Sequence, residues 1–194
     1  MGPLCLALKQ AEGVEVTVCV SGQHRDMLDS ALRLFDLVPD YDLDVMTPGQ
    51  DLYDVTSRIL IGMRDVLEVV QPDLVLVHGD TTTALATSMA AFYGGFKLGH
   101  VEAGLRTHNV YAPFPEEFNR KTISSIAAFH FVPTEISKTN LTSEGVSSSH
   151  IWVTGNTVID ALFLVLEKID NDTIRRDLII DGLQTFLDSH FGTQ

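Results

Sequence analysis

The segment Leu74-Val75-Leu76-Val77-His78 is a short, nearly continuous apolar run, and the turn residues Gly79-Asp80 follow it directly. A run of this length bounded by turn residues is typical of a parallel strand that is buried on both faces. Residues Thr82–Tyr93 then read as a helix that ends at Gly94-Gly95, and Lys97–Val101 reads as a second strand. A strand, a helix and a strand in this order predict a βαβ crossover with two parallel strands.

The same alternation of short apolar runs and longer amphipathic stretches extends over the rest of the chain. Further strands are expected at residues 14–20, 130–132 and 151–154. Further helices are expected at residues 24–35, 52–70, 115–129, 135–144, 157–169 and 173–187, with Asp51 as the cap of the second of these, and Leu4–Lys9 looks like the end of a helix. Repeated βα units predict an α/β fold, with a doubly wound, Rossmann-like parallel sheet and helices on both of its faces.

Composition and charge exclude several classes of protein. The chain has 194 residues, of which 45% are hydrophobic, and it carries a formal net charge of −13. The apolar content supports a folded core of one domain, and the acidic surface does not suit binding to nucleic acid or to an anionic membrane. The apolar runs are far shorter than the ~20 residues of a membrane-spanning helix. Cys5 and Cys19 lie in apolar surroundings and predict buried free thiols in a reducing compartment, which indicates the cytoplasm.

Acidic residues follow the ends of the predicted strands. Asp80 follows the strand at 74–78, Glu102 follows the strand at 97–101, and Glu116 lies in the next loop. Ligands of open parallel sheets bind beyond the carboxyl ends of the strands, so these side chains are expected along one edge of the sheet. Several carboxylates at one edge favour acid–base chemistry.

Each of these acids also has a purely structural interpretation. Asp80 is a suitable N-cap for the helix that follows it. Glu102 can form a structural ion pair with Arg106, because a buried carboxylate is costly without a partner. Glu116 and Glu117 fit the first turn of a helix, where carboxylates interact favourably with the helix dipole. None of these interpretations explains why the acids share one edge.

Other kinds of site lack their sequence signatures. The chain has no G-x-G-x-x-G dinucleotide fingerprint, no G-x-x-x-x-G-K-[ST] loop and no G-x-S-x-G nucleophile elbow. His78, His100 and His130 fall within predicted strands and are interpreted as core residues, and the other histidines are interpreted as surface or loop residues. No histidine pair has the spacing of a metal site and the cysteines are far apart, so no metal is expected.

Ordered motifs along the chain resemble one family. The motifs are VHGDTTT (Val77–Thr83), GHVEAGLRT (Gly99–Thr107), PFPEEFNR (Pro113–Arg120) and VTGNTVIDAL (Val153–Leu162). Together with VSGQHRDML (Val20–Leu28), they resemble the non-hydrolysing UDP-N-acetylglucosamine (UDP-GlcNAc) 2-epimerases of bacteria. The resemblance spans about Leu4 to Ile169.

The resemblance implies an isomerase that interconverts UDP-GlcNAc and UDP-N-acetylmannosamine (UDP-ManNAc) without a cofactor, by eliminating UDP and adding it back. The resemblance further implies a role in cell-surface polysaccharide biosynthesis. By motif, Asp80, Glu102 and Glu116 match the family's catalytic acids. Asp80 and Glu116 would be the acid–base groups on opposite faces of the sugar, and Glu102 would stabilise C1 or bind the sugar. Asp80, Glu102 and Arg106 would contact the UDP-sugar substrate.

The resemblance also implies partners and a second site. Gln23 and Glu117 match positions of a second UDP-GlcNAc site that activates some family members. Asp26 stands where such enzymes tend to have a neutral amide, and residues 46–50 lack the expected basic residue, which argues against effector control here. Members of the family are dimers through this domain, so a homodimer is expected.

The resemblance finally predicts the domain organisation. Residues 1–169 would be a Rossmann-like N-terminal domain without the family's first strand and its Gly-Thr-Arg-Pro-Glu loop, and residues 170–194 would lead to the hinge of a two-domain, GT-B-like architecture. The second domain, with the catalytic histidine and most UDP contacts, would be absent, so the chain alone is expected neither to bind UDP tightly nor to turn over. Two alternatives remain open. One is a non-catalytic interaction or dimerisation domain, and the other is a different nucleotide-sugar enzyme, such as a glycosyltransferase or a hydrolysing epimerase.

Overall fold

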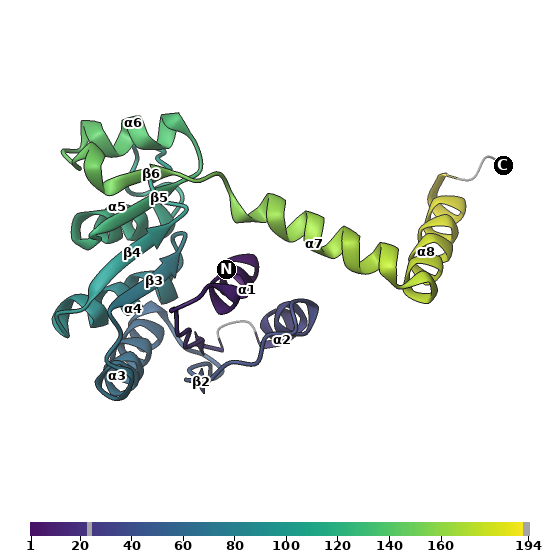
Figure 1. The fold of residues 1–194 in the computed structure, drawn as a ribbon, viewed down its shortest axis with the longest axis horizontal. Helices are drawn as coiled ribbons and strands as arrows, with labels where there is room; N and C mark the ends of the chain where they lie inside the picture. The colour runs from purple at the N-terminus through teal and green to yellow at the C-terminus, as the bar shows by residue number, and fades with distance from the viewer. Residues whose placement is uncertain (23–24, 192–194) are drawn as a thin grey trace. The chain divides into compact units, whose positions relative to one another are not determined.

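A computed structural model describes residues 1–22 and 25–191, and these divide into two compact units (Figure 1). The larger unit spans Met1–Asn156, and the smaller begins at Thr157. The larger unit contains a sheet of four parallel strands in the order β3-β4-β5-β6. Its strands are β3 (Leu74–His78), β4 (Lys97–Val101), β5 (Phe129–Val132) and β6 (Ile151–Val153).

Helices connect and cover these strands. In the larger unit they are α1 (Gly2–Gln10), α2 (Arg25–Leu34), α3 (Leu52–Val70), α4 (Thr82–Tyr93), α5 (Glu116–Ile126), α6 (Glu135–Ser143) and the 3₁₀ turn Ser148–His150. Figure 1 shows α3, α4 and α5 along one side of the sheet and α1 on the other side of β3. The predicted α/β fold with a parallel sheet is confirmed, and β3, α4 and β4 have the predicted bounds.

A large buried apolar cluster lies between the sheet and the pair α3 and α4, and a smaller one consists of Ala103, Val132, Leu141 and Ile151. Asp51 caps α3 through a capping box, in which its carboxylate accepts from Asp54 N at 3.0 Å and the Asp54 carboxylate accepts from Asp51 N. Helix α4 presents small residues to its neighbours, and both Ala86 and Ala91 are fully buried. Small side chains allow α4 to pack closely against its neighbours.

The predicted strand at residues 14–20 is only partly formed. Strand β1 covers Cys19–Val20 alone, and it pairs with a short strand β2 (Tyr41–Asp42) that the sequence did not predict. Val18 N donates to the side chain of Asp40 at 2.8 Å instead of to a neighbouring strand, so regular pairing begins only after it. Cys5 and Cys19 are free thiols, as predicted, but they are partly buried rather than fully buried.

The smaller unit consists of the helices α7 (Thr157–Asn171) and α8 (Thr173–Phe191). Among the described residues, no helix is both long and apolar enough to cross a membrane. The predicted domain boundary at residue 169 and the role of residues 170–194 stay predictions.

Candidate active site

The predicted acids come together at the edge where the parallel strands end. Asp80 follows β3, Glu102 follows β4, and Glu116 is the first residue of α5. Burial raises the pKa of Asp80, the Arg120 guanidinium opposes this rise, and the charges of Glu116 and Glu102 add to it. Strands β3 and β4 are neighbours in register, and α5 contacts Asp80 through Arg120, so Asp80, Glu102 and Glu116 lie along one edge of the sheet, which we call the acidic rim.

Asp80 is held by two residues of α5. Arg120 Nη2 lies 2.6 Å from Asp80 Oδ2, and Asn119 Nδ2 donates to the Asp80 carbonyl oxygen at 2.7 Å. The alternative role of Asp80 as a helix cap is wrong, because Thr81 is the N-cap of α4 and its hydroxyl accepts from Ala84 N at 3.2 Å. The Asp80 carboxylate is therefore free of a capping role and faces the rim with an arginine beside it.

Glu102 has an unusual backbone conformation. Its φ of 63° lies in the left-handed region, which residues other than glycine seldom adopt and which costs about 1–2 kcal/mol. His78 Nε2 lies 3.3 Å from Glu102 Oε2, and Asn156 Nδ2 donates to Glu102 Oε1 at 3.4 Å. Residues held in such a conformation cluster at functional sites, so the backbone supports a role for Glu102 beyond packing.

The first turn of α5 carries two glutamates with different surroundings. Within residues 1–22 and 25–191, Glu116 Oε2 is buried and has no hydrogen-bond partner. Glu117 is fully buried, and its carboxylate accepts from the backbone N–H groups of Thr107 and His108 at 3.1 and 3.2 Å. Glu117 thus fixes the loop that precedes α5. The Oε2 atom of Glu116 can accept a hydrogen bond or a proton from a molecule bound at the rim. The expected effector role of Glu117 stays a prediction.

Arg106 does not pair with Glu102, so the structural ion pair considered for these two residues is wrong. Its guanidinium donates instead to Glu144, the C-cap of α6, with Nε 2.9 Å from Oε1 and Nη2 2.8 Å from Oε2, and to Ser124 Oγ at 3.0 Å. Hydrogen bonds from Arg106 hold the pKa of Glu144 below its usual value. These contacts fasten the loop after β4 to two helices, and the expected contact of Arg106 with substrate stays a prediction.

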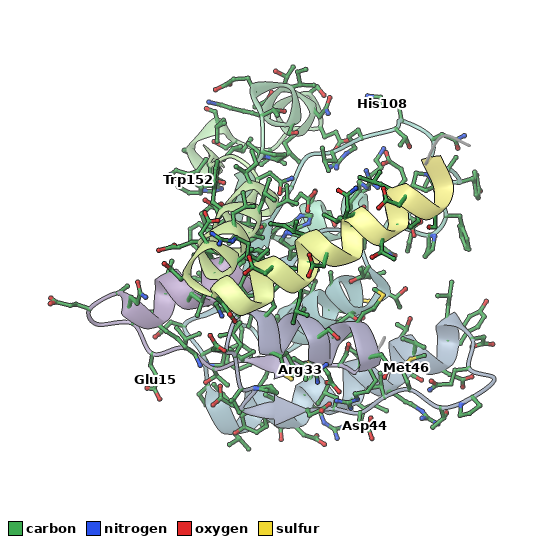
Figure 2. The ribbon with its side chains drawn as sticks, turned by 90° about the vertical axis from the view of Figure 1, so that its right-hand side faces the viewer. Glu15, Arg33, Asp44, Met46, His108 and Trp152 are labelled. Atoms are coloured by element: carbon green, nitrogen blue, oxygen red, sulfur yellow. The ribbon has the colours of Figure 1, made fainter. Side chains whose placement is uncertain are left out.

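The strand histidines divide into two kinds. His100 and His130 are buried in the core as predicted, and they face each other across β4 and β5. His100 Nε2 donates to the Gly79 carbonyl oxygen at 2.8 Å, which supports the loop that carries Asp80. His78 is only partly buried and lies at the rim against Glu102, so its interpretation as a core residue is wrong. His108, predicted at the surface, is exposed in the loop before α5 (Figure 2).

Three rim residues were not predicted as site residues, namely His78, Arg120 and Asn156. Each lies within a motif quoted above, and each is one to four residues from a predicted acid or from the end of a strand. Their positions in the sequence could have predicted them as site residues. The last residue of a strand and the first turn of the next helix lie at the same edge of an open sheet. Of the predicted effector residues, Gln23 lies outside the described residues.

Within the described ranges, no group of three His, Cys, Asp or Glu side chains is arranged to hold a metal ion. The rim combines carboxylates with one arginine and one imidazole. Such a set can remove and return protons and can stabilise a developing positive charge.

Comparison with known proteins identifies the family. The sequence profile of the UDP-N-acetylglucosamine 2-epimerase family matches residues 6–187. The chain belongs to this family. It is 58% identical over 173 residues to a protein from Ralstonia solanacearum named as a probable UDP-N-acetylglucosamine 2-epimerase, and 54% identical over 179 residues to the UDP-N-acetylglucosamine 2-epimerase of Escherichia coli O157:H7.

Solved structures of epimerases from this family share the fold. The UDP-GlcNAc 2-epimerase from Neisseria meningitidis, solved with UDP-GlcNAc, has a TM-score of 0.88 and 51% identity, and the match covers 91% of this chain and 48% of that one. The Methanocaldococcus jannaschii epimerase, solved with UDP-GlcNAc and UDP, has a TM-score of 0.83 and 30% identity over 97% of this chain and 49% of that one.

This epimerase-family chain is much shorter than its relatives. The matches cover 89% and 92% of this chain but only 46% and 48% of the Ralstonia and Escherichia proteins. The chain therefore spans about half the length of the curated relatives that it matches. The predicted GT-B-like scaffold agrees with these structural neighbours.

Proposed function

We propose that this chain supplies the acidic part of the active site of an enzyme that interconverts UDP-GlcNAc and UDP-ManNAc. The observation that carries the proposal is the acidic rim itself, in which the pKa of Asp80 is raised by burial and by the neighbouring charges of Glu116 and Glu102. Membership of the epimerase family supports the same conclusion.

The chemistry explains why an acidic rim is needed. The C2 proton of the sugar is not next to a carbonyl group, so its direct removal would be prohibitively slow. In an elimination, a carboxylate takes the C2 proton, the C1–O bond breaks, and UDP leaves with the electron pair, which gives a 2-acetamidoglucal. A proton is then delivered to the opposite face of C2, and UDP oxygen adds to C1. Carboxylates on both faces of the sugar can perform the proton transfers.

The three acids suit different steps. Glu116 has a buried oxygen atom without a partner in the described part of the chain, so it can accept a proton from a bound sugar. Burial raises the pKa of Asp80, so this carboxylate binds a proton more readily than an ordinary aspartate, and this suits it to return a proton from the other face. Glu102, whose oxygens face His78 and Asn156, is suited to stabilise positive charge that develops at C1.

The proposal also covers UDP binding, the oligomeric state of the enzyme and its place in the cell. The chain's net charge of −13 offers little to a diphosphate, so tight UDP binding requires residues beyond those of this chain. We propose a cytoplasmic homodimer that requires no added cofactor, that uses a second domain for most UDP contacts and that serves polysaccharide biosynthesis.

A hybrid enzyme tests the catalytic assignment. In it, this chain replaces the matching 173 residues of the Ralstonia relative, which keeps the rest of its own length. The hybrid should incorporate deuterium at C2 of UDP-GlcNAc in D2O, and Asp80→Asn or Glu116→Gln should each abolish this exchange. Asp73→Asn is the matched control, because this exposed acid lies at the opposite end of β3 and should leave exchange unchanged. Retained exchange in both rim variants would refute the assignment.

Calorimetry tests the need for further residues. The 194-residue chain alone should show no UDP binding at micromolar concentrations, whereas the hybrid should bind. A micromolar Kd for the chain alone would overturn this part of the proposal.

A further inference from the structure

The carboxylate of Glu102 is held from two separate parts of the fold. His78 is the last residue of β3 and pairs in register with Val101, so its side chain stands beside the residue that follows β4. Its Nε2 lies 3.3 Å from Glu102 Oε2. Asn156, which follows β6, donates from Nδ2 to Glu102 Oε1 at 3.4 Å. Each oxygen atom of the carboxylate therefore has its own neighbour.

The charge state of His78 decides what kind of contact this is. Burial lowers the pKa of His78, the nearby amino terminus lowers it further, and the charges of Glu102 and Asp80 oppose the change. A lowered pKa favours the uncharged imidazole, which can face a carboxylate only with the ring nitrogen that carries the proton. The nitrogen that lies 3.3 Å from the Glu102 carboxylate is Nε2.

The backbone of Glu102 explains why such a support is useful. A residue at φ 63° places its side chain in a direction that neighbouring strand residues do not share. Gly79 leaves space on the same side, since a Cβ atom there would come no closer than 3.9 Å to Glu102 Oε2. Without contacts at its oxygens, the carboxylate could rotate in this space, and a catalytic group must be held within a narrow range of positions.

We propose that His78 is a positioning residue whose Nε2–H donates to Glu102 Oε2 and, together with the amide of Asn156, fixes the direction of this carboxylate at the rim. For its effect on catalysis the inference rests on the proposed function. The contact itself does not depend on that function and can be tested in the chain as it stands.

The first experiment is an NMR titration of the histidine rings in the 194-residue chain. Nitrogen-15 shifts at pH 7 should show His78 neutral and protonated on Nε2. Glu102→Gln should lower the pKa of His78 by at least about 0.5, because it removes a negative charge at short range, and Asp73→Asn should not move it. A ring protonated on Nδ1, a charged ring at pH 7, or a pKa unmoved by Glu102→Gln would overturn the inference.

The second experiment uses the hybrid enzyme. His78→Phe should lower kcat about 10–100-fold with KM nearly unchanged, and His78→Gln, which keeps an N–H donor of similar reach, should recover most of the loss. His150→Gln is the matched control, because this exposed histidine precedes β6 at the far end of the sheet. Equal losses of kcat in the Phe and Gln variants would overturn the positioning role.

The outcomes separate the two proposals. A hybrid without any activity contradicts the proposed function, while the NMR titration of the chain still decides whether His78 holds Glu102. If His78→Phe does not fold, His78→Gln and the titration of the unsubstituted chain carry the test.

Discussion

Arg120 Nη2 of α5 lies 2.6 Å from Asp80 Oδ2 in the loop after β3, and this ion pair joins two of the motifs that identify the family. The Arg120 side chain is only 11% exposed, so the pair is shielded from water more than a surface salt bridge would be. The same arginine lies 3.5 Å from the buried Glu117 carboxylate. Arg120 therefore interacts both with Asp80 at the rim and with Glu117, which holds the loop before α5.

Removing this cation should change Asp80 in a measurable way. In Arg120→Gln the pKa of Asp80 should rise above its already raised value, because the charge that lowers it is lost while Glu116 and Glu102 remain. The free energy of unfolding should fall by about 1–3 kcal/mol, as expected for a shielded charged hydrogen bond. Carboxyl carbon-13 NMR and urea denaturation provide the two measurements.

The neighbouring cation is the control for this variant. Lys121 is largely exposed, and its ammonium lies 3.8 Å from Glu144 Oε1, away from Asp80. Lys121→Gln should leave the pKa of Asp80 unchanged and should cost less than about 1 kcal/mol. Equal effects of the two substitutions on Asp80 would show that the ion pair does not control this acid.

The buried histidines should make the fold sensitive to acid. Burial lowers the pKa of His100 and of His130 to about 4, well below the ordinary value of 6.5. The unfolded chain therefore binds protons at these sites from about pH 6.5 downward, whereas the folded chain does so only near pH 4. The free energy of unfolding therefore has its full value above pH 6.5. It decreases as the pH falls towards 4, by up to about 1.4 kcal/mol per pH unit for each histidine.

Urea denaturation between pH 7.5 and 5 measures this slope. His130→Phe should reduce the slope by up to about 1.4 kcal/mol per pH unit, most strongly between about pH 6 and 5, because one of the titrating groups is removed. His108→Gln, at an exposed histidine, should leave the slope as it is. An unchanged slope in His130→Phe would mean that this histidine is not kept neutral by the fold.

The sequence predicted those parts of the fold that depend on neighbouring residues. β3, α4 and β4 have the predicted bounds because apolar runs and the Gly94-Gly95 pair mark them locally. Strand β2 was not predicted, because Tyr41–Asp42 becomes a strand only by pairing with Cys19–Val20, far away in the chain. Local patterns carry no information on such pairing.

The site was predicted to a similar extent. The acids Asp80, Glu102 and Glu116 follow strand ends, so topology alone places them at one edge. The partners of these acids could not be predicted, because Arg120 meets Asp80 across 40 positions of sequence only after α5 has docked. The left-handed backbone of Glu102 was equally hidden, since a glutamate in the sequence gives no sign of a positive φ.

Gly104, two residues after Glu102, should not tolerate a side chain. Its φ is +82°, and a Cβ atom would lie 2.3 Å from the carbonyl oxygen of Ser137, which is backbone and cannot turn away. Gly104→Ala should therefore lower the free energy of unfolding by at least about 3 kcal/mol. Gly95→Ala is the matched control, because Gly95 has a similar φ of +77° but no atom within 4 Å of the added Cβ.

The comparison between the two glycines separates crowding from backbone strain. Gly95→Ala should cost only about 1–2 kcal/mol, the cost of a left-handed alanine. Urea denaturation of both variants gives the difference directly. Similar losses at the two positions would contradict the close approach of α6 to the loop after β4.

Glu102 permits a direct measurement of what its conformation costs. Glu102→Gly and Glu102→Ala both remove the carboxylate and its contacts with His78 and Asn156, so these losses cancel when the two variants are compared. At φ 63° the glycine variant should be more stable than the alanine variant by about 1–2 kcal/mol. At Asp73, which has no positive φ, the order should reverse, because glycine gains more freedom in the unfolded chain. If the alanine variant at position 102 is at least as stable as the glycine variant, the left-handed backbone carries no strain. The conformation of Glu102 would then no longer support a functional role for this residue.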